Sequence, residues 1–369
     1  MNKHILMALV FGSTFALHSA QDSTQEFELK EMAAENQDID RAKIIVIGAT
    51  GKQGEEYCDI LKDFADIAAF VVSPSFDEQK RVTLAKQLNI PILVGVDGLN
   101  EAIAQQQVNF DTALVTVPHD QHRVFTIPLL QSGKVIIKEK PLAMNYQEFL
   151  DYEAACPDSS TIPLLTIVQR RFQPSLEEAK KDIRLIGNPL TFSYDYMFKL
   201  PEVTSGWRAD KSKSGGGVVL DMGYHPLDVV NDFFGTPDSV EASFDFCYPE
   251  MREQDLEDRA VMNFIYPSGI EGTVQLSRQD QAKEEFFIRG TTGTITITPA
   301  KYVVHDLGQK LIKSFEPPIS PNPKRLIKET MLRAYLNNRF NGPYIAKELA
   351  RHKNTLRIID RIYRVAKRR

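Results

Sequence analysis

The sequence lacks the patterns that mark several classes of protein. Its three cysteines, Cys58, Cys156 and Cys247, are scattered and form no CxxC pair, so they indicate neither a metal cluster nor a disulfide framework. No internal repeat and no low-complexity tract is present. The net charge of −5 over 369 residues is small and argues against nucleic acid as the main partner. We therefore expect neither a bound metal nor a nucleic-acid partner.

No segment is long and apolar enough to predict a membrane span. The apolar run from Ile5 to Leu17 is shorter than the roughly 20 residues that a bilayer requires. It follows Lys3 and precedes a polar stretch, which outlines a signal peptide at 1–20 and a polar extension to residue 42. His18 is unfavourable near a cleavage site, and no twin arginine is present. The protein is therefore expected to be either cytoplasmic or exported, and a translation start at Met32 is a further alternative.

The remaining chain has the composition of a globular protein, with 43% apolar and 25% charged residues. Its length allows two domains. Between residues 43 and 160, short apolar runs rich in β-branched residues alternate with helical patterns. This rhythm predicts an α/β domain of the Rossmann type, with a doubly wound parallel sheet whose ligands lie beyond the carboxyl ends of its strands.

A glycine-rich turn follows the first predicted strand, 43–47, and precedes a helical pattern. Its spacing is G-x-x-G-x-x-G, and a strand, a turn and a helix in this order are the context of a dinucleotide-binding motif. The glycines permit close approach of the backbone to a pyrophosphate, whose charge the helix N-terminus stabilises. A glycine turn without a ligand is the alternative. The expected cofactor-binding residues are Gly48, Ala49, Thr50, Gly51, Lys52, Gln53 and Gly54.

The end of the second predicted strand bears on the choice between NAD and NADP. An acidic residue near this point binds the ribose 2′-hydroxyl in NAD-selective sites, but here Ser73 stands instead. Lys80 and Arg81 follow nearby. The absence of a carboxylate removes repulsion against a 2′-phosphate, so NADP is favoured. Asp77 is a second candidate for the acidic residue that binds the 2′-hydroxyl, so NAD is the alternative cofactor.

Two later strand ends carry polar residues that we expect at the same edge of the sheet. The first is Val117-Pro118-His119, with His122 shortly after it, and the second is Glu139-Lys140. Because the ends of parallel strands meet at one edge, Val117, Pro118, His119, His122, Glu139 and Lys140 are all predicted to line the cofactor site.

The pattern changes beyond residue 160. Several runs alternate apolar and polar residues, which predicts a second, α+β domain at 161–325 built on a mostly antiparallel open sheet. A strand at 164–168 is assigned to this domain. The basic segment 326–369 is expected to be helical. Its charge suggests nucleic acid or anionic lipid, but apolar residues recur at helical spacing, so we interpret it as a packing helix with a solvated face.

The most informative stretch runs from Gly215 to Asp228. Three glycines are followed by Asp221, His225 and Asp228, at steps of four and three that place side chains on one stripe of a helix. A carboxylate one turn from an imidazole is a plausible acid/base pair, because the carboxylate orients the ring. Pro226 interrupts a regular helix through this stretch.

Together these motifs resemble the glucose–fructose oxidoreductase/inositol dehydrogenase (Gfo/Idh/MocA) family. The resemblance covers roughly residues 43–300 and rests on motifs in family order: the glycine turn, Val117-Pro118-His119, His122, Glu139-Lys140-Pro141, Arg171-Phe172-x-Pro174 and the stretch from Gly215 to Asp228. It implies an NAD(P)-dependent oxidoreductase that transfers a hydride between a nicotinamide cofactor and a secondary alcohol or ketone. It also implies a sugar, amino sugar or cyclitol substrate and a homo-oligomer formed through the second sheet.

The resemblance further implies roles for single residues. Lys140 matches the lysine that contacts nicotinamide and substrate, and Asp221 and His225 match the other catalytic residues. His225, with a pKa near neutrality, is the expected base for the hydroxyl proton, and all three residues are expected to bind the substrate. Asp228 is expected to play a supporting role.

Three further residues of the second half are candidate substrate contacts. Trp207, the only tryptophan, is able to stack on a sugar ring, and Arg208 and Arg171 are able to clamp an anionic group. Structural packing or a surface ion pair is the alternative for each of them.

Two other functions stay open. One is a redox-neutral enzyme that retains its dinucleotide, of the glycosidase or sugar–sugar oxidoreductase type. The other is a non-catalytic dinucleotide-binding sensor. The presence of Lys140, Asp221 and His225 together argues against the sensor, which needs no acid/base residues.

Overall fold

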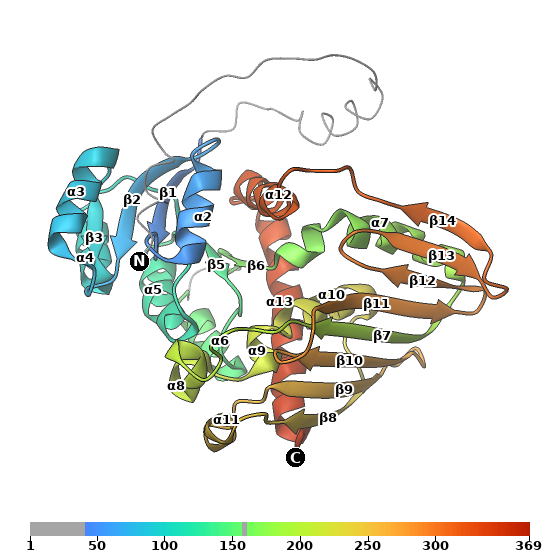
Figure 1. Cartoon of the computed structure of the whole chain (residues 1–369). Coiled ribbons are helices and arrows are strands. Elements are labelled where there is room, and N and C mark those ends of the chain that lie inside the picture. The colour runs from blue at the N-terminus through green and yellow to red at the C-terminus, as the bar shows by residue number, and fades with distance from the viewer. Residues whose placement is uncertain (1–40, 157–160) are drawn as a thin grey trace, which may run out of the picture. The chain divides into compact units, whose positions relative to one another are not determined.

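The computed structural model describes residues 41–156 and 161–369. The signal-peptide prediction for residues 1–20 lies outside the described residues. Residues 41–369 form one compact unit that contains a six-stranded and a nine-stranded sheet (Figure 1). Within the described ranges, no helix has the length and apolar character needed to cross a membrane.

The six-stranded sheet is parallel throughout, in the order β3-β2-β1-β4-β5-β6. Its strands are β1 (Lys43–Ile47), β2 (Asp66–Val72), β3 (Ile92–Val94), β4 (Thr112–Val115), β5 (Val135–Glu139) and β6 (Leu164–Ile167). This is the strand order of the Rossmann fold, in which the order of the strands reverses between β1 and β4 and ligands bind beyond the strand ends. The predicted doubly wound sheet is confirmed.

One strand belongs to a different sheet from the one predicted. β6 was assigned to the second domain, but it pairs with β5 in the parallel sheet, with Leu164 opposite Ile136. All four of its residues are buried, which is typical of a parallel strand covered on both faces.

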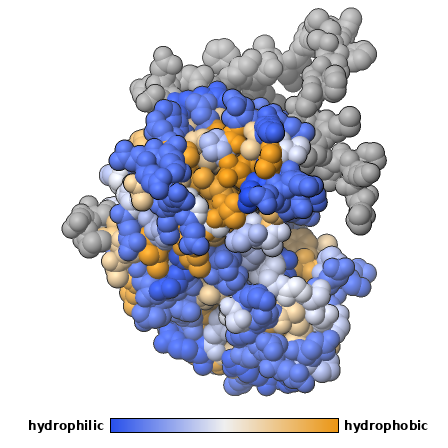
Figure 2. Space-filling view, turned by 90° about the vertical axis from the view of Figure 1, so that its left-hand side faces the viewer, coloured by the Kyte–Doolittle hydropathy of each residue, from blue (hydrophilic) through white to orange (hydrophobic). Residues whose placement is uncertain are grey.

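Five helices connect the strands of this sheet. They are α2 (Lys52–Leu61), α3 (Glu78–Leu88), α4 (Gly95–Ala104), α5 (His119–Gln131) and α6 (Tyr146–Ala154). α2 buries Tyr57, Ile60 and Leu61, which recur at helical spacing. α3 buries none of its residues, the neighbouring edge strand β3 is only half-buried, and Val82 is 46% exposed. On this side of the molecule an apolar area is exposed among polar residues (Figure 2).

The nine-stranded sheet has the order β14-β13-β12-β11-β7-β10-β9-β8-β15. Its strands are β7 (Pro189–Met197), β8 (Ser239–Asp245), β9 (Arg259–Ile265), β10 (Glu271–Ser277), β11 (Lys283–Gly290), β12 (Gly293–Ile297), β13 (Tyr302–Asp306), β14 (Leu311–Phe315) and β15 (Lys367–Arg368). Pairing is antiparallel except between β7 and β10 and between β8 and β15. Burial alternates along β8 and β9, so one face packs on the core, as the sequence pattern predicted.

The second half also holds a set of helices. They are the 3₁₀ turns η1 (Gln169–Phe172), η2 (Ile183–Ile186) and η3 (Gly206–Ala209), and the α-helices α7 (Pro174–Asp182), α8 (Lys211–Ser214), α9 (Val218–Asp221), α10 (Tyr224–Phe234), α11 (Pro249–Glu253), α12 (Pro323–Asn337) and α13 (Gly342–Val365). α13 buries Leu356, Ile359 and Ile362 in the largest core cluster, which contains residues of both sheets. The basic C-terminal segment is therefore helical, in two helices followed by the short strand β15, and α13 packs on the core.

The interruption expected near Pro226 is present, because the stretch is divided into α9 and α10. Pro226 is the third residue of α10, where its missing N–H leaves no helical hydrogen bond unmade. A Cβ at Gly223 would lie 2.5 Å from Leu276 Cδ1 and 2.6 Å from Val219 O. The chain therefore changes direction at a glycine that packs closely against β10, and the single stripe of Asp221, His225 and Asp228 does not exist.

A buried ion pair fixes the start of β9 to the end of β10. Arg278 and Asp258 are 1% and 0% exposed, and Arg278 Nε lies 2.8 Å from Asp258 Oδ1. The other carboxylate oxygen accepts a hydrogen bond from the Cys247 N–H at 2.8 Å. Because neither charge reaches water, each depends on the other for compensation.

We predict that Arg278→Met lowers the free energy of unfolding by about 3–5 kcal/mol, because it leaves a buried carboxylate without its cation. The matched control is Arg259→Met, which breaks the nearby Arg259–Asp280 pair, whose side chains are 44% and 42% exposed. This change should cost about 1 kcal/mol or less. Urea unfolding measures both, and equal losses would contradict the prediction.

Candidate active site

The glycine turn follows β1, at the point where the strand order of the Rossmann sheet reverses between β1 and β4. Gly48 has a φ of +84°, and a Cβ on it would lie 3.0 Å from Thr116 Oγ1 at the end of β4. A Cβ at Gly54 would lie 2.2 Å from Gly48 O, so only glycine lets the first turn of α2 approach this closely. Gly51 precedes α2 without a side-chain cap. The seven residues Gly48–Gly54 thus present the N-terminus of α2 beyond β1, which fits the pyrophosphate of a dinucleotide.

The residues that follow β2 carry the hydroxyls of Ser73 and Ser75. The nearby carboxylates of Asp77 and Glu78 both have partners. Ser73 is exposed, and its Oγ lies 2.8 Å from Ser75 Oγ. Asp77 Oδ1 accepts a hydrogen bond from the Lys80 N–H at 2.9 Å and caps α3. Arg81 is half-buried and pairs with Glu78 at 3.4 Å. The one acidic candidate for a ribose contact is therefore already occupied as a helix cap.

The residues after β4 lead into α5 and contact the second half of the chain. Val117 and Pro118 lead directly into α5, whose first residue is His119. His119 Nδ1 lies 2.9 Å from Ser214 O, and burial and then Lys140 lower the pKa of His119 to about 4. His119 therefore joins the two halves of the chain as a neutral ring.

His122 does not reach the surface of the site. It is 1% exposed, and its Nε2 lies 3.0 Å from Val117 O. The ring is enclosed beneath the strand end that it supports, and its cofactor contact stays a prediction.

The end of β5 carries the adjacent residues Glu139 and Lys140. Tyr57 of α2 donates a hydrogen bond from its hydroxyl to Glu139 Oε1 at 2.7 Å. Burial raises the pKa of Glu139, and Tyr57 and Lys140 oppose that rise. Glu139 thus ties the strand end to the helix of the glycine turn.

Lys140 meets Asp221 across the two halves of the chain. Its Nζ lies 3.0 Å from Asp221 Oδ1 and also donates to the Asp221 carbonyl. Arg208 Nε lies 2.7 Å from Asp221 Oδ2. Burial alone would raise the pKa of Asp221, but Lys140 and then Arg208 lower it well below the usual range. Asp221 is therefore a carboxylate clamped between two cations.

His225 is a neutral imidazole with one nitrogen unused. It is 8% exposed, and its Nδ1 has no hydrogen-bond partner among the described residues. Burial, followed by the charges of Lys140 and Arg170, lowers its pKa well below the ordinary value. The expected pKa near neutrality is wrong for this environment, since the sequence alone shows neither burial nor two nearby cations.

Trp207 and Arg208 lie in η3, at the entrance of this group. The Arg208 guanidinium stands 4.4 Å from the centre of the Trp207 ring, and that ring lies 4.7 Å from the His119 ring. The Arg208 side chain is 42% exposed. Arg170, whose Nη2 lies 3.2 Å from Tyr196 Oη and 3.1 Å from Glu284, contributes a further cation. Two guanidinium groups therefore lie near Asp221 and His225, and the Trp207 ring packs against one of them.

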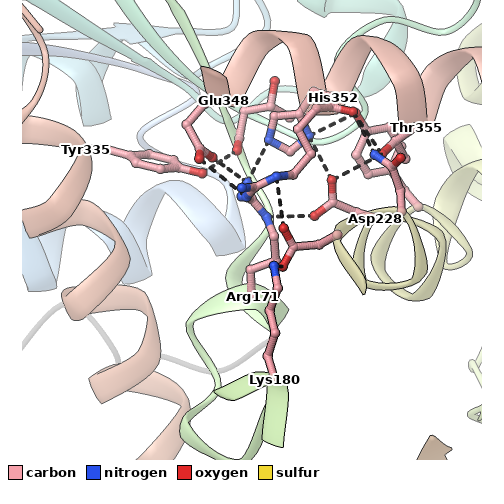
Figure 3. Close-up of polar contacts among 12 residues, drawn as sticks. Arg171, Lys180, Asp228, Tyr335, Glu348, His352 and Thr355 are labelled. Carbon is pink, nitrogen blue, oxygen red and sulfur yellow. Dashed lines mark hydrogen bonds and ion pairs between the residues drawn. The ribbon is translucent and has the colours of Figure 1, made fainter. Parts of the chain in front are cut away.

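Arg171 lies in a separate buried cluster, and its substrate contact stays a prediction that this burial disfavours. Its Nε is 2.7 Å from Asp228 Oδ2, and its Nη2 is 2.7 Å from Glu348 and 3.0 Å from His352 Nε2 (Figure 3). The side chain is 7% exposed and ties η1 to α10 and α13. Asp228 is accordingly structural.

The site contains no sign of a metal centre within residues 41–156 and 161–369. No group of three or more His, Cys, Asp or Glu side chains there is arranged to hold a metal ion. The chemistry available is that of a lysine, a carboxylate and a neutral imidazole beside a fitting dinucleotide cradle.

Comparison with known proteins assigns a family to both halves of the chain. Residues 42–163 match the family model described as an oxidoreductase family with an NAD-binding Rossmann fold, and residues 180–296 match the GFO/IDH/MocA C-terminal domain. The mouse trans-1,2-dihydrobenzene-1,2-diol dehydrogenase is 25% identical over 251 residues, covering 66% of this chain and 70% of the relative. The D-xylose 1-dehydrogenase (NADP(+)) 2 of Haloferax volcanii is 25% identical over 227 residues, covering 61% and 67%.

Among solved structures, the aldose–aldose oxidoreductase of Caulobacter crescentus superposes with a TM-score of 0.73 at 23% identity. The superposition covers 88% of this chain and 97% of that one. At this identity the likeness supports the fold. The two family models, together with the Rossmann sheet and the mostly antiparallel second sheet, show that this chain is a member of the Gfo/Idh/MocA family of oxidoreductases with an NAD(P)-binding domain.

Proposed function

We propose that this protein transfers a hydride between NADP and a secondary alcohol or ketone of a polyhydroxylated ring, namely a sugar, an amino sugar or a cyclitol. The observation that carries the proposal is the Lys140–Asp221 pair, which brings the end of the nucleotide-binding sheet to a carboxylate beside a neutral histidine. The cradle at Gly48–Gly54 fits the dinucleotide, which when bound supplies the hydride acceptor or donor.

Each residue of the group has a separate task in this proposal. Lys140 Nζ, fixed by Asp221, donates a hydrogen bond to the substrate oxygen and favours its developing negative charge during oxidation. His225 accepts the hydroxyl proton at Nε2, because its Nδ1 is buried away from the substrate. Asp221 holds Lys140 and is itself held by Arg208. A side chain that is clamped from both sides needs little reorganisation during the reaction.

The proposed substrate class follows from the entrance to the site. Trp207 is half-buried against Arg208 and His119, and a sugar ring would pack on the remaining surface of its indole. Arg208 keeps N–H donors that Asp221 does not use. The names of the two relatives indicate a cyclic diol and a pentose as their substrates, which supports a ring alcohol here.

We predict that the purified protein oxidises members of a panel of pyranoses and inositols with NADP. Asp221→Asn should lower kcat/KM by about 100-fold or more, because Lys140 loses its charged partner. Absorbance of the reduced nicotinamide measures the rate. The matched control is Asp228→Asn, which alters an equally buried aspartate outside the site and should act mainly on thermal stability. Absence of turnover with every ring alcohol, or equal loss of activity in both variants, would refute the proposal.

NADP is favoured because no free carboxylate stands at the end of β2. We predict that Ser73→Asp weakens NADP binding by about tenfold or more, because the new carboxylate repels the 2′-phosphate, and strengthens NAD binding. Fluorescence titration of the purified protein with each dinucleotide measures both affinities. Ser75→Ala, which removes a neighbouring hydroxyl and adds no charge, is the control. Tighter binding of NAD than NADP by the unaltered protein would contradict this choice.

The lowered pKa of His225 predicts an unusual pH profile. Since a lowered pKa keeps the imidazole neutral below the ordinary value, kcat/KM for alcohol oxidation should not fall as the pH drops through about 6.5. Initial rates between about pH 5.5 and 8 test this, with thermal stability recorded at each pH. An acidic limb near 6.5 that disappears in His225→Asn would show that the ring titrates normally.

A further inference from the structure

The backbone of α9, which ends at Asp221, is bound by one buried glutamate that lies outside every motif. Glu257, just before β9, is 0% exposed. Its carboxylate accepts hydrogen bonds from the N–H groups of Gly217 at 3.2 Å and Val219 at 2.9 Å, and its backbone carbonyl accepts from Val218 at 2.8 Å. A single residue, Glu257, therefore accepts hydrogen bonds from three consecutive N–H groups.

A tyrosine of the C-terminal helix completes this arrangement. The Tyr363 hydroxyl of α13 donates to Glu257 Oε1 at 2.8 Å and accepts from the Leu220 N–H at 3.3 Å. All four N–H groups from Gly217 to Leu220 are thereby satisfied from outside the helix. The residue that follows them is Asp221.

The three glycines before α9 explain how these side chains come so close. A Cβ at Gly217 would lie 2.3 Å from Glu257 O, and a Cβ at Gly216 would lie 2.2 Å from Tyr363 Oη. A Cβ at Gly215, whose φ is +75°, would lie 3.0 Å from Met144, in the segment after Lys140. Each glycine thus admits a different neighbour: the Lys140 segment, α13 and Glu257.

We propose that Glu257 and Tyr363 are positioning residues that fix Asp221 against Lys140. A helix of four residues has no stability of its own, so its place depends on these external bonds. The inference rests on the proposed function, in which the Lys140–Asp221 pair carries the chemistry. It also assigns a role to α13, which lies beyond the residues that the family models match.

The chain supplies a matched pair of tyrosine variants for the test. Tyr363→Phe removes the hydroxyl beside Glu257. Tyr302→Phe removes a buried hydroxyl that also donates to a carboxylate, that of Asp182, but it lies on β13, away from the site. Tyr363→Phe loses two hydrogen bonds and Tyr302→Phe loses one, so both should lower the melting temperature. Only the first should affect Asp221.

We expect Tyr363→Phe to lower kcat by about tenfold while the Kd for NADP stays unchanged, because small displacements of a catalytic group are costly. Glu257→Gln, which loses one acceptor oxygen, should have at least as large an effect. Tyr302→Phe should leave kcat unchanged. The same variants are treated with acetic anhydride, and acetylation of Lys140 is followed by mass spectrometry. Lys140 should react several-fold faster in Tyr363→Phe, since a displaced Asp221 releases its amine.

The two readouts separate this inference from the proposed function. If the unaltered protein turns over no ring alcohol, the acetylation rates still decide whether Tyr363 positions the ion pair. Faster acetylation of Lys140 in Tyr363→Phe than in Tyr302→Phe supports the inference. Equal acetylation rates in these two variants, with any drop in kcat matched by Tyr302→Phe, would overturn it.

Discussion

The ion pair between Lys140 and Asp221 is the interaction on which the rest of the site depends. Its side chains are 14% and 5% exposed, and they come from the two halves of the chain. Burial of two such charges is costly unless the geometry compensates it. Here Arg208 satisfies the second carboxylate oxygen, and the Asp221 carbonyl gives Lys140 another acceptor. The pair therefore joins the end of β5 in the parallel sheet to the end of α9 in the second half of the chain.

The stretch from Gly215 to Asp228 contributes one aspartate to each of two buried clusters. Asp221 ends α9 and faces Lys140, whereas Asp228 lies in α10 and binds Arg171. Gly223 lets the chain change direction between them, so a spacing of seven does not place them on one stripe. Two aspartates that look equivalent in the sequence thus have unrelated partners.

The parts predictable from the sequence are those set by local patterns. The Rossmann sheet follows from apolar runs that alternate with helices, and the glycine turn follows from its place after β1. The surroundings of Arg171 were not predictable, because its partners Glu348 and His352 lie about 180 residues away on α13. The altered pKa of His225 depends on burial, which spacing does not show. The contacts of Glu257 and Tyr363 with α9 were not predictable, because single residues before a strand and within a helix form no motif.

The central claim is that Lys140 and Asp221 act as one unit in hydride transfer. A double-mutant cycle on kcat/KM with Lys140→Met, Asp221→Asn and the combined variant tests it most directly. If the two residues act together, the combined variant should be about as slow as the slower single variant. If the two losses multiply, each residue acts independently, and the account given for this site is contradicted.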